Sequence, residues 1–149
     1  MSERTRAIFA LWRLDTDLQR AETLAASLTA QLGDQVKVKA ADLAIRRAQE
    51  GVARAKAAQK DAEFALAQLE TRIKEHTALL WSGKGSPRDL EALRVELERE
   101  AVRRGALEEA ALGAMEVTAR AERDAARVEA NVAKALAELK SGNATRVAE

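Results

Sequence analysis

The residues best suited to binding chemistry surround the strongest turn in the sequence, at residues 82–86. They are one indole ring and three cations, namely Trp81, Lys84, Arg88 and Arg94. Cations beside a flat ring can grip the acidic surface of a protein or a phosphate backbone. A structural interpretation competes with this one, because residues 72–104 hold eight Lys or Arg against six Asp or Glu, and Trp81 could plug the end of a helical seam. We predict a partner-binding site at these four residues and refer to it as the tip site.

No residue pattern typical of catalysis or metal binding is apparent. His76 is the single histidine and the chain has no cysteine, which excludes disulfides and an ordinary zinc site within these residues. Gly83-Lys84 lacks the spaced glycines and the preceding strand of a nucleotide-binding loop. We therefore expect a protein that is not an enzyme and needs no cofactor or metal, with His76 in a packing position near the turn.

A second candidate surface is the densest apolar cluster of the chain, near its start. It is formed by Ile8, Phe9, Leu11 and Trp12. If no other part of the chain covers it, such a patch is a docking surface for another helix. Three arrangements remain open here: the segment folds back on the rest of the chain, pairs in a homodimer, or docks on another protein.

A seven-residue repeat of apolar side chains predicts the elements that position these residues. Eleven of thirteen core positions of the repeat are apolar between residues 38 and 80, and twelve of fifteen between 90 and 139. Ala fills consecutive positions of one column, from Ala41 to Ala62, so that two helix axes can approach closely as an antiparallel pair. Polar residues interrupt the seam at Gln59, Glu100, Arg104 and Thr118, and Glu100 and Arg104, one turn apart, can pair with each other on one helix.

Capping signals mark the start of the second helix. Ser86 is a suitable N-cap, Pro87 fits the first helical position, and Asp89 follows three residues after the cap. At the other end, the sequence Lys140-Ser141-Gly142-Asn143 is typical of a helix stop.

The first helix carries an interruption of its own. The seam from Leu11 to Leu32 is out of phase with the one that starts at Val38, so we expect a kink or turn at about Gly33. The predicted fold is all-α, an elongated antiparallel coiled-coil helical hairpin with a kinked or folded-back N-terminal helix. Its elements are one domain of residues 1–149, with helix about 4–32, break 33–37, helix about 38–81, tip 82–86, helix about 87–140 and a frayed tail 141–149.

Composition narrows the function classes. With 25 Lys or Arg against 24 Asp or Glu, the net charge is +1, which gives no chain-wide attraction for nucleic acid or an anionic membrane. No apolar run approaches the roughly 18 to 20 residues that span a bilayer, and the start at Met1 does not resemble a signal peptide. We expect a cytoplasmic protein.

The turn also resembles a known family, the bacterial coiled-coil proteins with a C-terminal four-cysteine zinc ribbon. Their tip motif runs approximately Leu-Tyr-Ser-Gly-Lys, two variable residues, Asn-Pro-Lys-Glu-Leu. Residues 80–84 read Leu-Trp-Ser-Gly-Lys and residues 87–90 read Pro-Arg-Asp-Leu, and the similarity extends over about residues 11–139. The loop is altered at Gly85-Ser86 and the four cysteines are missing, so we interpret the chain as the coiled-coil part or as a member without its ribbon.

The resemblance implies a regulatory adaptor that binds a protein partner, either an alternative sigma factor of the nitrogen class or a component of flagellar or type III secretion. Two alternatives stay open. The chain could be a structural stalk of a flagellar or type III export apparatus, whose small two-helix proteins resemble this chain only in their hairpin form. Its tip could instead bind nucleic acid such as RNA, with an affinity that falls steeply with salt.

Overall fold

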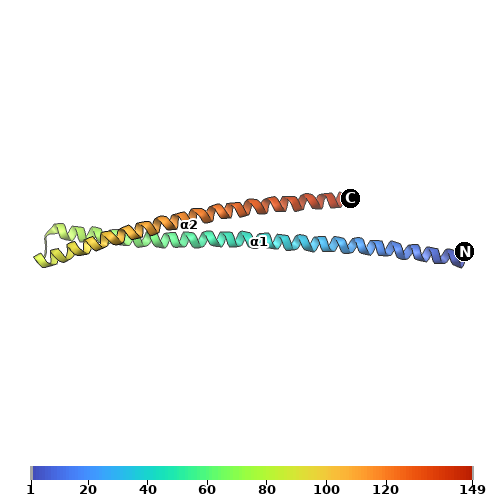
Figure 1. Cartoon of the computed structure of the whole chain (residues 1–149), viewed down its shortest axis with the longest axis horizontal. Helices are drawn as coiled ribbons and strands as arrows, with labels where there is room; N and C mark the ends of the chain where they lie inside the picture. Colours follow the sequence, from blue (N-terminus) through green and yellow to red (C-terminus); the bar gives the residue numbers. More distant parts are fainter. Residues whose placement is uncertain (1, 149) are drawn as a thin grey trace. The chain divides into compact units, whose positions relative to one another are not determined.

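The computed structural model describes residues 2–148 and consists of two helices, α1 (Glu3–Ser82) and α2 (Pro87–Ala148). α1 begins after Ser2, whose hydroxyl accepts a hydrogen bond from the Thr5 amide at 3.3 Å and so caps the first turn. Pro87, the one proline of the chain, stands at the first position of α2, where its missing N–H costs nothing. The predicted all-α coiled-coil hairpin is confirmed (Figure 1).

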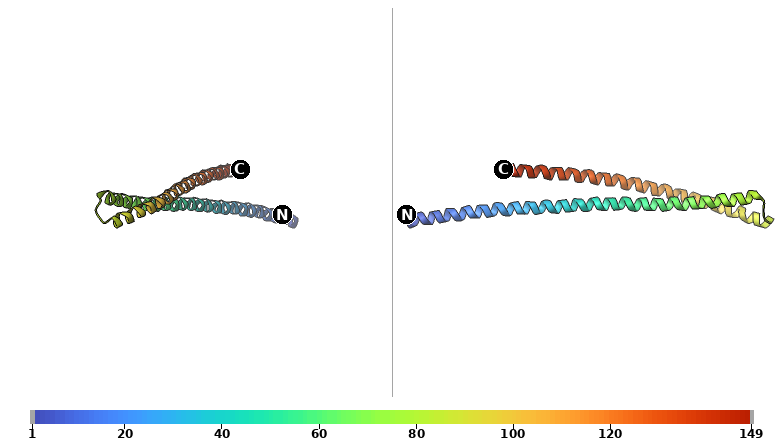
Figure 2. Two further views of the ribbon diagram at one scale, coloured as in Figure 1. Left: turned by 60° about the vertical axis from the view of Figure 1, so that its left-hand side comes forward. Right: turned by 180° about the vertical axis from the view of Figure 1, so that it is seen from behind.

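The chain divides into two units. Unit 2 is Ile45–Asn131, which contains the later part of α1, the connecting loop and the first part of α2. Unit 1 joins Met1–Ala44 with Val132–Glu149. In unit 2 the two helices run antiparallel and side by side from the loop onward (Figures 1 and 2).

The seam of unit 2 follows the seven-residue repeat. Its most buried side chains are Ala55, Leu69, Ala111 and Ala125, together with the polar Glu100 and Thr118, and all six lie at core positions of the repeat. Small side chains bury little apolar area each, so the seam stabilises the pair through its length rather than through bulky contacts.

Three polar contacts between the helices fix the register of unit 2. They are Lys56 Nζ to Glu122 Oε1 at 3.0 Å, Arg104 Nη2 to Glu70 Oε1 at 3.3 Å and His76 Nδ1 to Glu100 Oε2 at 2.9 Å. In each pair the two residue numbers add up to about 176, as antiparallel pairing at one register requires. The same register sets the polar residue Gln59 opposite the polar residue Thr118, and both line one groove of the surface.

α1 passes through residues 33–37 without interruption, so the predicted break there, and with it a folded-back N-terminal helix, is wrong. Positive φ angles occur at Gly83 and Gly85 and not at Gly33, whose backbone is helical. A glycine inside a helix costs about 1 kcal/mol relative to Ala, which helix formers on both sides can offset, whereas a proline would have ended the helix.

The expected stop near Lys140 is also wrong, because α2 continues to Ala148. The Thr145 hydroxyl donates hydrogen bonds to the carbonyl oxygens of Ser141 and Gly142 at 3.1 and 2.9 Å, a contact made within a continuing helix. Glu149, the last residue of the predicted frayed tail, lies outside the described residues.

In unit 1 the end of α2 lies against α1 at about Val38. One groove is lined by Asp34 and Val38 of α1 and by Leu136, Leu139 and Asn143 of α2, among others, which continues antiparallel pairing. Among the described helices, none is long and apolar enough to cross a membrane.

Candidate functional site

The loop between the helices ends α1 through a glycine in the left-handed conformation. Gly83 has φ of 63°, and its amide donates to the Leu80 carbonyl oxygen at 3.3 Å. The Ser82 hydroxyl donates to the Leu79 carbonyl oxygen at 2.6 Å, so two carbonyls of the last turn have partners. A residue with a Cβ would be strained at this φ, which is why glycine suits the position.

The start of α2 is held by a reciprocal cap between Ser86 and Asp89. The Asp89 amide donates to the Ser86 hydroxyl, and the Ser86 amide donates to Asp89 Oδ2, both at 3.2 Å. Hydrogen bonding from Ser86, by its side chain first and its backbone second, holds the pKa of the Asp89 carboxyl below its ordinary value. The predicted cap is confirmed, and it fixes where the first residues of α2 stand.

The side chains of the tip site project from this well-ordered turn into solvent. Trp81 is 84% exposed, so it does not plug the end of the seam. Lys84 and Arg88 are exposed too, and within residues 2–148 neither forms an ion pair. Arg94 differs, because its Nη1 lies 3.7 Å from Glu91 Oε2 on the same helix. The loop therefore brings Trp81, Lys84 and Arg88 into one short segment, with Arg94 further along α2 and partly neutralised.

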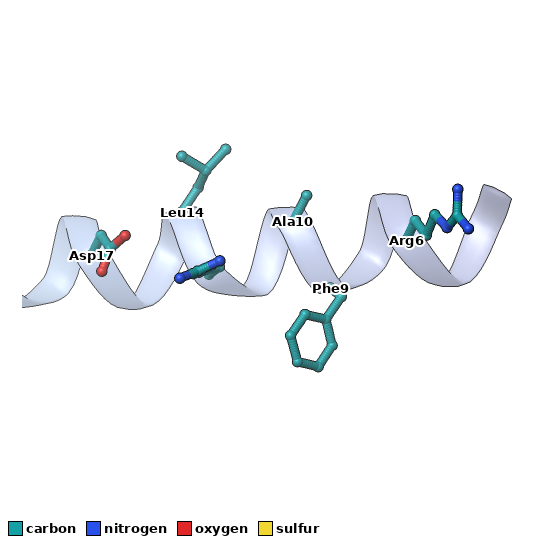
Figure 3. A pocket seen from close by; sticks show the side chains of 6 residues that line it. Arg6, Phe9, Ala10, Leu14 and Asp17 are labelled. Carbon is teal, nitrogen blue, oxygen red and sulfur yellow. The ribbon is translucent and has the colours of Figure 1, made fainter. Parts of the chain in front are cut away.

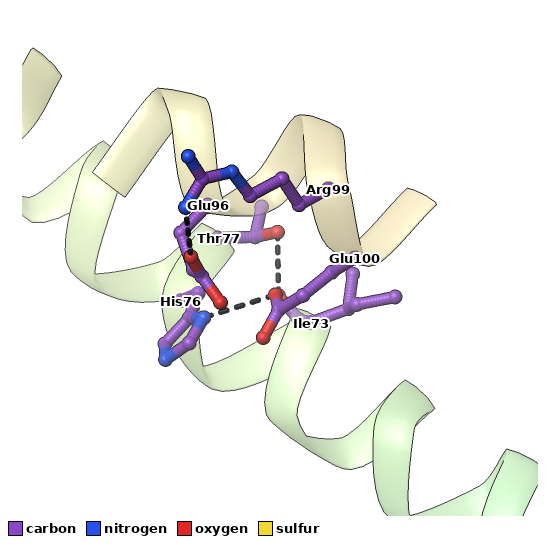
Figure 4. Close-up of polar contacts among 6 residues, drawn as sticks. All are labelled: Ile73, His76, Thr77, Glu96, Arg99 and Glu100. Carbon is purple, nitrogen blue, oxygen red and sulfur yellow. Dashed lines mark hydrogen bonds and ion pairs between the residues drawn. The ribbon is translucent and has the colours of Figure 1, made fainter. Parts of the chain in front are cut away.

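Near the loop, a histidine of α1 and a carboxylate of α2 form a hydrogen bond across the seam. Figure 4 shows His76 on α1 facing Glu100 on α2, with Nδ1 and Oε2 2.9 Å apart. Glu100 is only 3% exposed, and its second oxygen, Oε1, has no hydrogen-bond partner among the described residues. A buried carboxylate depends strongly on the partner it has, so His76 holds the two helices in register just below the tip.

Glu100 and Arg104, which could pair with each other on one helix, have other partners. Arg104 binds Glu70 across the seam and Glu108 Oε1 at 2.9 Å on its own helix, while Glu100 turns inward to His76. The i to i+4 rule holds for Arg104 and Glu108, whereas Glu100 has its partner on the other helix, which a rule for one helix does not consider. Both residues are polar and stand at core positions of the seam, and this is the signal that could have found the His76–Glu100 pair.

The sequence interpretation also missed Leu79, which lies two residues before Trp81 and is 55% exposed. It stands outside the columns of the repeat, and an apolar residue outside the seam at a helix end is the signal that could have identified it. Within residues 2–148, no three carboxylate or histidine side chains lie close enough together to hold a metal ion.

The second candidate surface lies in unit 1 and is exposed throughout. Ile8, Phe9, Leu11 and Trp12 all project from α1 into solvent, and the rings of Phe9 and Trp12 stack at a tilt with centroids 5.8 Å apart. Figure 3 shows a shallow pocket beside them, in which Leu14 and Phe9 point to different sides of the same helix. Apolar groups therefore lie on more than one side of this part of α1, between the charged Arg6, Arg13 and Asp17, and the fold-back that would have covered them is absent.

Comparison with known proteins gives one match. No curated protein and no solved structure matches the chain. The family model described as the CT398-like coiled coil hairpin domain matches residues 11–149, which include the seam, the tip loop and α2. The hairpin seen in unit 2 is the architecture that this description names. The chain therefore belongs to the CT398-like coiled-coil hairpin domain family.

Proposed function

We propose that this chain is a non-enzymatic adaptor that works in the cytoplasm and binds an acidic surface of a protein partner through the tip site. The observation that carries the proposal is the exposed Trp81 beside two cations without ion-pair partners among the described residues. A large ring that stays in water costs free energy unless a partner covers it, and Trp and Arg are enriched at the energetic centres of protein interfaces.

The structure favours a protein over RNA as the occupant of the tip. A phosphate backbone is bound by several unpaired cations in a row, but Arg94 and Arg104 are already engaged by carboxylates. Two free cations and one indole suit a small acidic and apolar patch better than a charged polymer.

The turn beneath the tip site supports binding without large rearrangement. The glycine conformation, the Ser86–Asp89 cap and the His76–Glu100 pair hold the last turn of α1 and the first turn of α2. Little conformational freedom remains to be lost when a partner binds, which favours affinity. Because the sequence resembles the zinc-ribbon coiled-coil family, an alternative sigma factor and a flagellar or type III secretion component are the first partners to test.

The test is a binding experiment with purified candidate partners and a tip variant that carries Trp81→Ala, Lys84→Ala and Arg88→Ala. The matched control removes one Trp and two Arg from the other candidate surface, as Trp12→Ala, Arg6→Ala and Arg13→Ala. Isothermal calorimetry should show binding that is lost or weakened at least tenfold in the tip variant and kept in the control.

The same titration is repeated with a mixed-sequence RNA oligonucleotide over a range of salt concentrations. RNA binding that falls steeply with salt and depends on the same three residues would replace the protein partner by nucleic acid. Equal binding of a partner by wild type and tip variant would overturn the proposal and leave the tip as a turn only.

A further inference from the structure

Within unit 1, α1 continues well beyond the part that α2 can accompany. Val38 of α1 lies at the level of Leu139 of α2, where both line one groove. Nine residues of α2 follow Leu139, up to Ala148. Both helices rise by about 1.5 Å per residue, so these nine residues can lie beside only about nine residues of α1 before Val38. The part of α1 before about residue 29 therefore has no described residue of α2 beside it.

This unaccompanied part carries a complete apolar seam. Leu11, Leu14, Leu18, Leu28 and Leu32 are between 51% and 72% exposed, and Ala21 and Ala25 fill the remaining positions of the repeat. The seam is offset by one residue from the one that starts at Val38, which turns it by about 100° around α1. Leu32, at the level of the last residues of α2, is 63% exposed, so this face stays free even where α2 runs beside α1.

We propose that the seam from Leu11 to Leu32 binds the same seam of a second copy of this chain, antiparallel, as a homodimer. The order of large and small side chains along the seam carries the inference. In one antiparallel register, both alanines of the seam face a leucine of the other copy: Ala21 faces Leu18 and Ala25 faces Leu14. Leu11 then faces Leu28, and Leu32 faces Ala7, which lies one core position before the seam. Facing large and small residues fill the space between two helices evenly.

A parallel pair lacks this match. Ala21 would face Ala21 and Ala25 would face Ala25, which leaves a thin stretch between two leucine layers. It would also bring Asp17 at one flank close to Glu22 of the other copy. The antiparallel pair has one unfavourable contact of its own, Asp15 opposite Glu22, and we therefore expect dimerisation to tighten when salt screens this repulsion.

The area available is enough for an interface of modest strength. A leucine side chain hides roughly 100 Å² when it is covered, so ten leucines from two copies bury on the order of 1,000 Å² before the flanking residues count. Specific interfaces begin at about this size. The dimer should consequently dissociate on dilution, and its formation does not depend on the tip site.

Sedimentation velocity of the full chain over a hundredfold concentration range tests the proposal. Wild type should pass from monomer to dimer, and Leu18→Glu should raise the dissociation constant at least tenfold with its helicity unchanged by circular dichroism. The control is Leu112→Glu in unit 2, because Leu112 is about as exposed as Leu18, at 61% against 57%. A wild type that stays monomeric, or equal effects of both substitutions, would overturn the proposal.

The absence of cysteine from the natural chain allows a direct test of direction. Leu11→Cys and Leu28→Cys are made as separate variants that differ in mass, mixed and oxidised mildly. The antiparallel pair predicts the mixed disulfide, because residue 11 faces residue 28, whereas two residues with the same number lie about 26 Å apart along the axis. Disulfides that join identical variants would show a parallel pair and contradict the inference.

Discussion

Unit 2 and the N-terminal part of α1 carry the same kind of seven-residue apolar repeat, yet one seam is buried and the other is exposed. Leu69 in unit 2 is 5% exposed, whereas Leu18, also at a core position of its own repeat, is 57% exposed. The difference comes from the chain connection, since the tip loop returns α2 along one seam, and the described residues of α2 do not lie beside the other. A repeat shows which face of a helix is apolar, whereas the connection of the chain determines which helix, if any, packs against that face.

The largest expected difference between the two regions concerns leucine. Leu69→Ala removes buried methyl groups and should lower the free energy of unfolding by about 3 kcal/mol. Leu18→Ala should change it by less than about 0.5 kcal/mol at a concentration where the chain is monomeric, because the side chain is already in water. Urea unfolding followed by circular dichroism measures both, and equal losses would mean that the N-terminal seam is covered within one chain.

The second largest difference between the two regions should be the stability lost when a polar side-chain contact is removed. His76→Ala leaves the Glu100 carboxylate buried without its partner and should cost roughly 2 kcal/mol. Arg20→Ala breaks the exposed contact of 3.9 Å with Asp17 and should cost less than about 0.5 kcal/mol.

A double replacement checks the reason for the loss at His76. If the cost arises from the orphaned carboxylate, His76→Leu combined with Glu100→Leu should restore stability to near wild type. A double variant as unstable as His76→Ala would instead point to the packing of the imidazole ring.

The two helix starts offer a third comparison. Ser86→Ala removes the cap that also orders the tip and should cost about 1 kcal/mol in thermal or urea unfolding of the hairpin. Ser2→Ala removes a cap in the unaccompanied part of α1 and should fray only the first turn, which amide hydrogen exchange can resolve.

The cap of α2 has a defined pH dependence. Because the folded chain lowers the pKa of Asp89, the cap stabilises fully above the ordinary pKa of an aspartate. That contribution is lost as the pH falls through the lowered pKa of the folded state. The stability difference between wild type and Asp89→Asn should therefore be present at neutral pH and vanish in strong acid, and a difference that grows on acidification would contradict the assignment.

The smallest expected effect concerns glycine. Gly33→Ala should raise helix stability by up to about 1 kcal/mol, since a Cβ there meets no atom within 4 Å. Gly83→Ala should act in the opposite direction, because its φ of 63° strains any residue with a Cβ. Amide exchange around each position reports both changes, and a loss of protection in Gly33→Ala would mean that the residue serves as a hinge.

The repeat and the caps allowed the hairpin to be predicted from sequence, including the start of α2 at Pro87. The predictions of a break at Gly33 and of a helix end near Lys140 were wrong. A glycine, or a shift in the phase of the apolar repeat, weakens a helix without ending it. Whether such a weak point bends depends on contacts in space, and along this solvent-exposed stretch little packing opposes continued helix.

The candidate sites also include features that could be predicted from the sequence and one contact that could not. Exposure of Trp81 and of the N-terminal apolar residues agrees with their position outside the seam of unit 2. The contact between His76 and Glu100 was missed, because it joins residues that are 24 positions apart and depends on the register of two helices. Partner binding by the tip site stays a prediction until a partner is measured.

The polar layers of unit 2 have a mechanical consequence. In a seam of apolar positions that repeat every seven residues, one helix could slide by seven residues along the other and still meet mostly apolar side chains. After such a slide, however, Glu100 would lose His76, and Arg104 would lose Glu70. The loss of these polar contacts opposes sliding of one helix along the other. A force applied at the tip would therefore move both helices together.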